Sequence, residues 1–236
     1  MIQIADLQFA YPKSFFQLNI DRLEFREAQT TAVVGSSGSG KTTLLHLIAG
    51  ILLPDKGEIR VGGSTLTKLS DSERRRFRLT KVGFIFQEFE LIEYLNVVDN
   101  VLLAARIDSA VTLTPQLRSR AVELLETVGL KKHAKKSIIR LSQGERQRVA
   151  ICRALLLQPK LILADEPTGN LDPVTSNHIL DLLFAAVRAE SSTLVMVTHD
   201  HSLLHRFDET VDFAQFLSSS TGNLNIKNAA AGDVAQ

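Results

Sequence analysis

Residues 33–43 read Val33-Val34-Gly35-Ser36-Ser37-Gly38-Ser39-Gly40-Lys41-Thr42-Thr43, an apolar run that leads into a glycine-rich loop. The apolar pattern of residues 44–49, typical of a helix, follows directly. Two glycines with four residues between them, followed by lysine and threonine, fit the Walker A spacing, in which backbone N–H groups turn inward around phosphate oxygens. A helix N-terminus adds favourable partial charge. The stretch therefore predicts a strand, a phosphate-binding loop and a helix.

The chemistry of this loop indicates which residues would hold a nucleotide. Lys41 is expected to reach the β- and γ-phosphates, and the Thr42 hydroxyl is expected to ligate a magnesium ion that bridges them. Tyr11, at a turn between two expected strands, could stack on an adenine ring or could simply cover the core from its rim. The expected ATP-binding residues are Tyr11, Gly35, Ser36, Ser37, Gly38, Ser39, Gly40, Lys41, Thr42 and Thr43.

Length and composition fit one α/β domain, alone or with a smaller inserted subdomain. The chain has 236 residues, of which 44% are hydrophobic and 22% are charged, with a formal net charge of +1. This balance gives no broad electrostatic case for a nucleic-acid partner. No apolar stretch approaches the length of a membrane span, and residues 1–6 lack the pattern of a signal peptide, so we expect a cytosolic chain. The single cysteine, Cys152, is expected to be buried and inert.

Apolar runs and turn residues predict the order of the other elements. Strands are expected at residues 2–9, 16–20, 31–34, 82–86, 160–164 and 193–197, with a further short strand inside 53–63. Helices are expected at residues 71–78 and from the 141–145 segment to 157, with a mainly helical stretch over 88–140. Residues 210–217 and 224–226 are expected to form an edge hairpin, and residues after 227 to be frayed.

An acidic pair, Asp165-Glu166, follows one of the apolar strands. The carboxyl ends of parallel strands are where α/β proteins place ligand-binding groups, and two adjacent carboxylates there would repel each other without a cation. Asp172 and Pro173 follow as a helix start, with Asp as the N-cap and Pro at the first helical position.

Several motifs in this order give the chain a specific resemblance. They are Tyr11, the Walker A loop, Gln87, the 141–145 segment, Asp165-Glu166, Leu171-Asp172 and His199. The chain resembles the ATPase subunit of an ABC transporter over residues 2–226. The resemblance implies an α/β P-loop NTPase fold. Residues 1–87 and 158–226 would form the core together with an antiparallel β subdomain, and residues 88–157 would form an inserted α-helical subdomain. Together these form a single domain, 1–226, followed by a flexible tail, 227–236.

The resemblance also assigns roles to side chains. Glu166 would orient and deprotonate the attacking water, while His199 would contact the γ-phosphate and Gln87 would sense the metal and the water. Asp165 would hold Mg²⁺ together with Thr42 and Gln87. The implied cofactors are ATP and Mg²⁺.

The signature segment of the family closes over the ATP of a second subunit, which implies a head-to-tail dimer with two-fold symmetry. Here that role falls on Ser142, Gln143, Gly144 and Glu145, and Asp172 would lie at the interface. The usual Leu-Ser-Gly-Gly-Gln is changed at Gln143 and Glu145. The placement of the backbone at Gln143 and the charge of Glu145 near phosphate are open at this point.

Residues 82–91 and 166–172 resemble the branch of lipoprotein-release, macrolide-efflux and cell-division ATPases. The implied function is an ATP-hydrolysing motor that drives separate membrane subunits through its helical subdomain, at the cytoplasmic face of the membrane, with no nucleic acid expected. The groove for the partner, or else the subdomain core, would be formed by Phe89, Leu91, Ile92, Tyr94 and Leu95. A soluble ABC protein of DNA repair or translation and a P-loop phosphotransferase are the alternatives.

Overall fold

The computed structural model describes residues 1–108, 110–169 and 171–216, and it contains two sheets. The first is antiparallel, with the order β2-β1-β4-β5. Its strands are β1 (Ile2–Ala10), β2 (Gln17–Phe25), β4 (Lys56–Val61) and β5 (Ser64–Thr65). Alternating burial along β1 and β2 leaves one face apolar, and this face packs toward the rest of the domain.

The second sheet is parallel throughout and has the order β6-β7-β8-β3-β9. Its strands are β3 (Thr30–Val34), β6 (Val82–Ile85), β7 (Leu161–Asp165), β8 (Thr193–Val197) and β9 (Glu209–Asp212). All five residues of β3, of β7 and of β8 are buried, as expected for a sheet covered on both faces.

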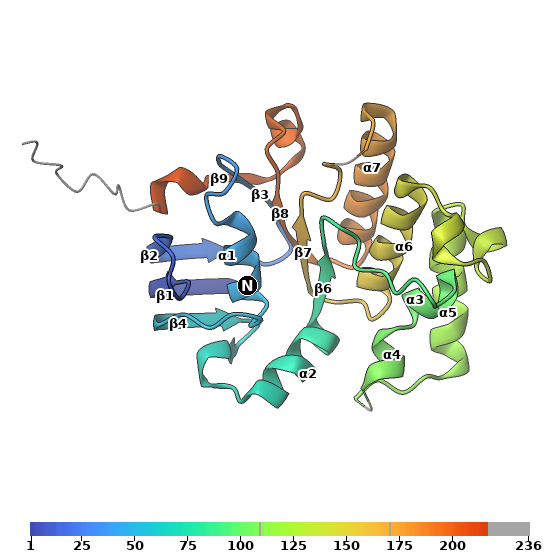
Figure 1. Cartoon of the computed structure of the whole chain (residues 1–236), viewed down its shortest axis with the longest axis horizontal. Helices are drawn as coiled ribbons and strands as arrows, with labels where there is room; N and C mark the ends of the chain where they lie inside the picture. The colour runs from blue at the N-terminus through green and yellow to red at the C-terminus, as the bar shows by residue number, and fades with distance from the viewer. Residues whose placement is uncertain (109, 170, 217–236) are drawn as a thin grey trace, which may run out of the picture.

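Helix α1 (Lys41–Ile48) lies between the two sheets in Figure 1. Its apolar side chains belong to the same buried cluster as residues from β1, β2, β3 and β7. Gly50 has a φ of 64° just after the helix, a left-handed conformation that ends helices and that glycine adopts without strain. The core of the domain therefore fixes the helix that follows the glycine-rich loop.

Two more clusters lie on the other side of the parallel sheet, and α6 (Gln143–Leu155) takes part in both. One joins α6 and α7 (Pro173–Ala189) to the parallel sheet. The other joins α6 to α3 (Val97–Val101) and α5 (Pro115–Thr127), which gather with α4 (Ala104–Ile107) at the right of Figure 1. Helix α6 is thus the element that attaches this helical group to the sheet.

The remaining helical elements are short or superficial. They are α2 (Asp71–Lys81) and the 3₁₀ turns Leu66–Lys68, Lys131–His133, Ile138–Arg140, His201–Arg206 and Phe213–Phe216. The described part of the chain contains no helix that is both long and apolar enough to cross a membrane.

The expected strands are confirmed within a few residues, but the expectation of a mainly helical stretch over 88–140 is wrong for its first part. Residues 88–96 form turns and extended backbone. Asn100 supports this loop: it is fully buried, and its side chain accepts from the Ile92 N–H and donates to the carbonyls of Ile92, Leu95 and Asn96. One buried side-chain amide therefore provides hydrogen-bond partners for the backbone of this loop. In a helix, the backbone itself would provide them.

The first arm of the expected edge hairpin, 210–217, is a shorter strand at the edge of the parallel sheet. Strand β9 ends at Asp212 and pairs in parallel with β3, and a 3₁₀ turn follows it. The second arm, 224–226, and the expected frayed tail, 227–236, lie outside the described residues.

Cys152 is 1% exposed, and burial raises the pKa of its thiol to about 12. At pH 7 the reactive thiolate is then a fraction of about 10⁻⁵. We expect a thiol reagent such as DTNB to leave the native protein unmodified at pH 7 over an hour, and to modify one thiol per chain once guanidinium has unfolded it. Rapid labelling of native protein, followed by absorbance, would contradict the buried, inert thiol.

Candidate functional site

Four of the sequence motifs meet at one edge of the parallel sheet. The glycine-rich loop follows β3, Gln87 comes two residues after β6, Asp165 ends β7, and His199 comes two residues after β8. Because β6, β7, β8 and β3 are consecutive and parallel, their carboxyl ends open onto the same edge. Short apolar strands thus deliver residues that are far apart in sequence to one place.

The glycine-rich loop wraps around the side chain of Lys41. Gly40 is the N-cap of α1 and has a φ of 97°, which favours glycine. Lys41 is only 5% exposed, and its Nζ donates to the carbonyls of Gly35 and Ser36 at 2.8 Å each. An ammonium group held by the loop's own carbonyls is a cation ready to bind an anion.

A cavity of about 340 Å³ lies beside this loop. Its lining residues are Tyr11, Phe16, Ser37, Gly38, Gly40, Lys41, Thr42, Thr43, Gln87, Glu166 and Val197. The structure therefore brings nine of the expected site residues to one cavity. Gly35, Ser36 and Ser39 belong to the loop but do not line the cavity, and Ser39 is buried.

Phe16 is a lining residue that the sequence analysis did not identify. A Cβ atom at Gly40 would lie 2.4 Å from the tip of the Phe16 ring, so the ring packs against the loop backbone and would have to shift for any larger residue. The ring centroids of Phe16 and Tyr11 are 5.8 Å apart. The sequence analysis placed Phe16 at a strand start, and its position in the loop before β2 gave no signal of a contact with Gly40.

Tyr11 is 38% exposed and is held from two sides. Its hydroxyl lies 3.1 Å from Thr43 Oγ1, in hydrogen-bond contact, and its ring meets Phe9 edge to face with centroids 4.9 Å apart. The exposed part of the ring faces the cavity that contains Phe16. Two aromatic rings beside a phosphate loop can stack on a planar base.

Asp165 is 5% exposed at the end of β7. Burial raises the pKa of its carboxyl, although a hydrogen bond with Thr42 acts in the opposite direction. His46, a further residue that the sequence analysis missed, lies close enough for Asp165 to act on its charge, and burial lowers the pKa of this imidazole. A buried carboxylate with a raised pKa is stabilised by a cation.

The donor set at this point fits magnesium. A threonine hydroxyl and a carboxylate oxygen are hard ligands, and Mg²⁺ in phosphate-binding sites uses one or two such protein groups together with phosphates and waters. The described residues hold no group of three His, Cys, Asp or Glu side chains suited to a metal.

Glu166, which lines the cavity, lies against His199, which does not line it. Glu166 Oε2 lies 3.1 Å from His199 Nδ1, and the backbone N–H of Glu166 donates to the Val197 carbonyl at 3.1 Å. Glu166 has a φ of 42°, a left-handed conformation that costs a non-glycine residue about 1 kcal/mol or more. A carboxylate held this way and oriented by an imidazole can act as a general base on a water in the cavity.

The signature segment lies elsewhere. Ser142 is the N-cap of α6 and forms a capping box with Glu145: the Glu145 N–H donates to Ser142 Oγ at 3.3 Å, while the Ser142 N–H and hydroxyl both donate to Glu145 Oε2 at 2.8 and 3.0 Å. These hydrogen bonds, that of the Ser142 backbone first, hold the pKa of Glu145 below its ordinary value. None of Ser142, Gln143, Gly144 and Glu145 lines the cavity.

Two further residues set the packing around the signature segment. Gly144 is buried, and a Cβ there would lie 2.9 Å from Thr175 Cγ2, so α6 and α7 approach closely at this point. Asp172, the expected interface residue, is exposed and caps α7: its Oδ1 accepts from the backbone N–H groups of Val174 and Thr175 at 3.1 and 3.0 Å.

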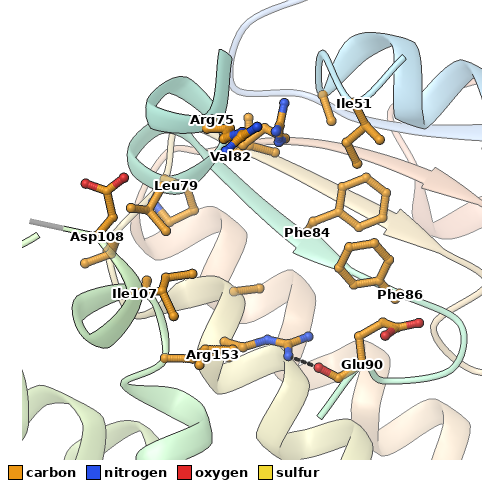
Figure 2. A pocket seen from close by; sticks show the side chains of 17 residues that line it. Ile51, Arg75, Leu79, Val82, Phe84, Phe86, Glu90, Ile107, Asp108 and Arg153 are labelled. Carbon is orange, nitrogen blue, oxygen red and sulfur yellow. Dashed lines mark hydrogen bonds between the residues drawn. The ribbon is translucent and has the colours of Figure 1, made fainter. Parts of the chain in front are cut away.

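A second cavity, of about 560 Å³, lies between the core and the helical group. Figure 2 shows Phe84 and Phe86 on one side of it and Ile107 and Arg153 on the other. The stacked rings of Phe84 and Phe86 are 4.2 Å apart. None of Phe89, Leu91, Ile92, Tyr94 and Leu95, the residues expected to form a groove or the subdomain core, lines it. Leu91 instead packs against the helical cluster, as the core alternative predicts.

Arg153 belongs to α6 and links this helix to the wall of the second cavity. Its guanidinium donates to the carbonyls of Glu90 and, at 2.7 Å, Phe89, and burial lowers its pKa to about 10. Phe89 and Glu90 have φ values of 63° and 47°, so Arg153 holds a strained turn three residues after Gln87. The contact joins the Gln87 segment to the helix that begins at the signature.

Comparisons with known proteins agree with this geometry. The family model described as "ABC transporter" matches residues 18–169. Lipoprotein-releasing system ATP-binding protein LolD 1 of Rhodopirellula baltica is 42% identical over 212 residues, covering 89% of this chain and 92% of the relative. LolD of Xanthomonas campestris pv. campestris is 40% identical, covering 82% and 80%.

Among solved structures, the dimeric ATP-binding cassette MJ0796, in a post-hydrolysis state bound to ADP and Pi, superposes with a TM-score of 0.81 at 32% identity. The match covers 90% of this chain and 95% of that one. These relatives favour a transporter subunit over the alternative of a soluble protein of DNA repair or translation.

Proposed function

The chain belongs to the ABC transporter family, in which it is an ATP-binding and ATP-hydrolysing motor subunit, and from this premise we propose that it drives a membrane complex of the lipoprotein-releasing type. One observation carries the proposal: the Walker A loop, Gln87, Glu166 and the two aromatic rings line one cavity. The chain is also 42% identical to a LolD protein. The substrate would then be a lipid-modified protein, recognised by the membrane subunits.

The phosphates of ATP would bind in the glycine-rich loop. Lys41 would exchange its contacts with the Gly35 and Ser36 carbonyls for the β- and γ-phosphate oxygens, while backbone N–H groups at the start of α1 donate to the other oxygens. Tyr11 and Phe16 would stack on the base. Stacking recognises the face of a planar ring but makes no hydrogen bond to the polar groups at its edge.

Glu166 would take the proton of the attacking water, since it lines the cavity and lies 3.1 Å from His199. His199 would hold this carboxylate in place and donate to the γ-phosphate. Thr42, Asp165 and Gln87 would hold Mg²⁺, which would supply positive charge to offset the negative charge that develops on the phosphates.

Two subunits would close head to tail, with the signature of one over the nucleotide of the other. Ser142, Gln143, Gly144 and Glu145 lie away from their own cavity, and the relative MJ0796 is a dimer. The backbone N–H groups at the start of α6 would donate to the partner's γ-phosphate. Asp172 would lie at the same interface, next to the helix that Gly144 touches.

We propose that the second cavity receives a short helix from a membrane subunit. Its lining is apolar at Phe84, Phe86 and Ile107, and it lies between the two parts that nucleotide binding would move relative to each other (Figure 2). Arg75, Arg78 and Arg153 bring positive charge to the same cavity, whereas Glu90 and Asp108 bring negative charge. An amphipathic helix with polar ends fits this lining.

The division into a core with its β part (1–87 and 158–226) and a helical part (88–157) remains a proposal, supported by the separate helical cluster around α3, α5 and α6. Docking through the second cavity would hold the chain at the cytoplasmic face of the membrane that contains its partners.

Replacing Ile107 by aspartate tests the docking site. Ile107 is 66% exposed and lines the second cavity, so an added carboxylate should disfavour an apolar helix there. We expect at least a tenfold loss of the subunit that co-purifies with lipoprotein-release-type membrane subunits, measured by quantitative blotting after co-expression. The matched control is Ile139→Asp, at an isoleucine that is 61% exposed and does not line the cavity. Equal loss in both variants, or in neither, would contradict this docking site.

A further inference from the structure

The signature segment carries an acidic side chain where the proposed dimer brings a γ-phosphate. Glu145 lies one turn into α6, three residues after Ser142, and the low pKa of its carboxyl keeps it ionised at neutral pH. A carboxylate that is free to move near a phosphate opposes binding, since two like charges a few ångströms apart repel each other. The position of the Glu145 side chain therefore bears directly on whether the dimer can close.

The structure holds both oxygens of this carboxylate. Oε2 accepts the two hydrogen bonds from Ser142, and Oε1 lies 3.2 Å from Nδ1 of His133. His133 belongs to the 3₁₀ turn Lys131–His133, outside α6. Its Nδ1 is buried and has no hydrogen-bond partner among the described residues, so the 3.2 Å approach to Oε1 is a close contact outside hydrogen-bond geometry. The side chains of His133 and Glu145 are 29% and 22% exposed, so water only partly screens the contact.

We propose that His133 is a positioning residue of the signature, which holds the Glu145 carboxylate in its capping box and away from the γ-phosphate bound by the partner subunit. The inference rests on the proposed two-site dimer. When the dimer closes, the Ser142 hydroxyl passes from Glu145 Oε2 to the phosphate, while the contact between Oε1 and His133 keeps the carboxylate turned back.

His133 acts on Glu145 from a different element than the other cation near it. Arg148 lies on α6 itself, three residues further along, and also favours the ionised carboxylate. Arg148 therefore moves with Glu145, whereas His133 ties α6 to the turn after α5.

The test is a double-mutant cycle in Glu166→Gln protein. This protein should bind ATP without hydrolysing it and should therefore accumulate as the closed dimer. The ATP concentration that gives half dimer, without magnesium, is measured by size exclusion with light scattering. We expect His133→Leu to raise this concentration about tenfold, the effect of losing one polar contact to a charged group. Glu145→Gln, which keeps the capping box without the charge, should not raise it, and adding His133→Leu to Glu145→Gln should change nothing further.

The controls separate positioning from folding. Lys132→Leu removes an exposed positive charge from the neighbouring residue and should leave the midpoint unchanged. Thermal unfolding and binding of a fluorescent ATP analogue to the monomer show whether each variant is folded, and His133→Ala takes the place of His133→Leu if leucine is not tolerated.

Two results would overturn the role of His133 alone: no shift in His133→Leu, or the same shift with and without Glu145→Gln, which would make the effect structural. A Glu166→Gln parent that stays monomeric at saturating ATP would overturn the two-site dimer and, with it, this inference.

Discussion

Glu166→Gln is expected to lower the rate of ATP hydrolysis by about 10²–10⁴-fold, the usual contribution of a general base, while ATP still binds. The amide keeps the size of the side chain and can still contact His199, which lies 3.1 Å away, but it cannot accept the proton of water. Phosphate release at saturating ATP measures the rate. The same protein should form a dimer in ATP without magnesium and return to a monomer when ATP is removed.

The matched control is Glu123→Gln, because Glu123 is an exposed glutamate on α5, away from the cavity. Its turnover should equal that of the unaltered protein. Unchanged turnover in Glu166→Gln would show that Glu166 is not the general base, and that another group at the edge of the cavity has this role.

Lys41→Ala is expected to weaken ATP binding by about 100-fold and to reduce hydrolysis to background. Lys41 is the cation that lines the cavity at the glycine-rich loop, and hydrogen bonds between charged groups contribute about 1.5–3 kcal/mol each. Removing it also leaves the Gly35 and Ser36 carbonyls without their donor. Isothermal titration with ATP measures the affinity, and thermal unfolding measures the cost to the fold.

Lys160→Ala is the control for this variant. Its ammonium group also donates to a backbone carbonyl, that of Glu190 at 2.8 Å, but it lies outside the cavity. ATP affinity should be unchanged there. Equal weakening in both variants would indicate a general loss of stability, and retained affinity in Lys41→Ala would contradict the phosphate site.

The sequence predicted the parts of the fold that depend on local patterns. The strands that end near Asp165 and His199 are short runs of apolar residues, and a run of this kind between polar turns specifies a buried strand by itself. Parallel strands then bring the residues after them to one edge, so the location of the cavity followed from the strand ends. Asp172 and Pro173 marked the start of α7 for an equally local reason.

The features that the sequence did not predict depend on contacts between distant residues. Phe16 meets Gly40 across 24 positions, and nothing in the loop around Phe16 indicates this. Asn100 satisfies the backbone of a loop that composition alone suggested was helical. Likewise β9 pairs with β3 although nearly the whole chain separates them. Register and side-chain pairing of this kind are set by tertiary packing rather than by local propensity.

Helix α6 also has a mechanical consequence. It runs from the signature at Gln143 to Leu155, with Arg153 at the wall of the second cavity. Thirteen residues at 1.5 Å each make a rod of about 20 Å. If such a rod tilts by about 10° at one end, the other end moves by about 3.5 Å, more than the length of a hydrogen bond. A push at the second cavity that tilted α6 by this angle would therefore be enough to break the hydrogen bonds of the capping box at the other end of the helix.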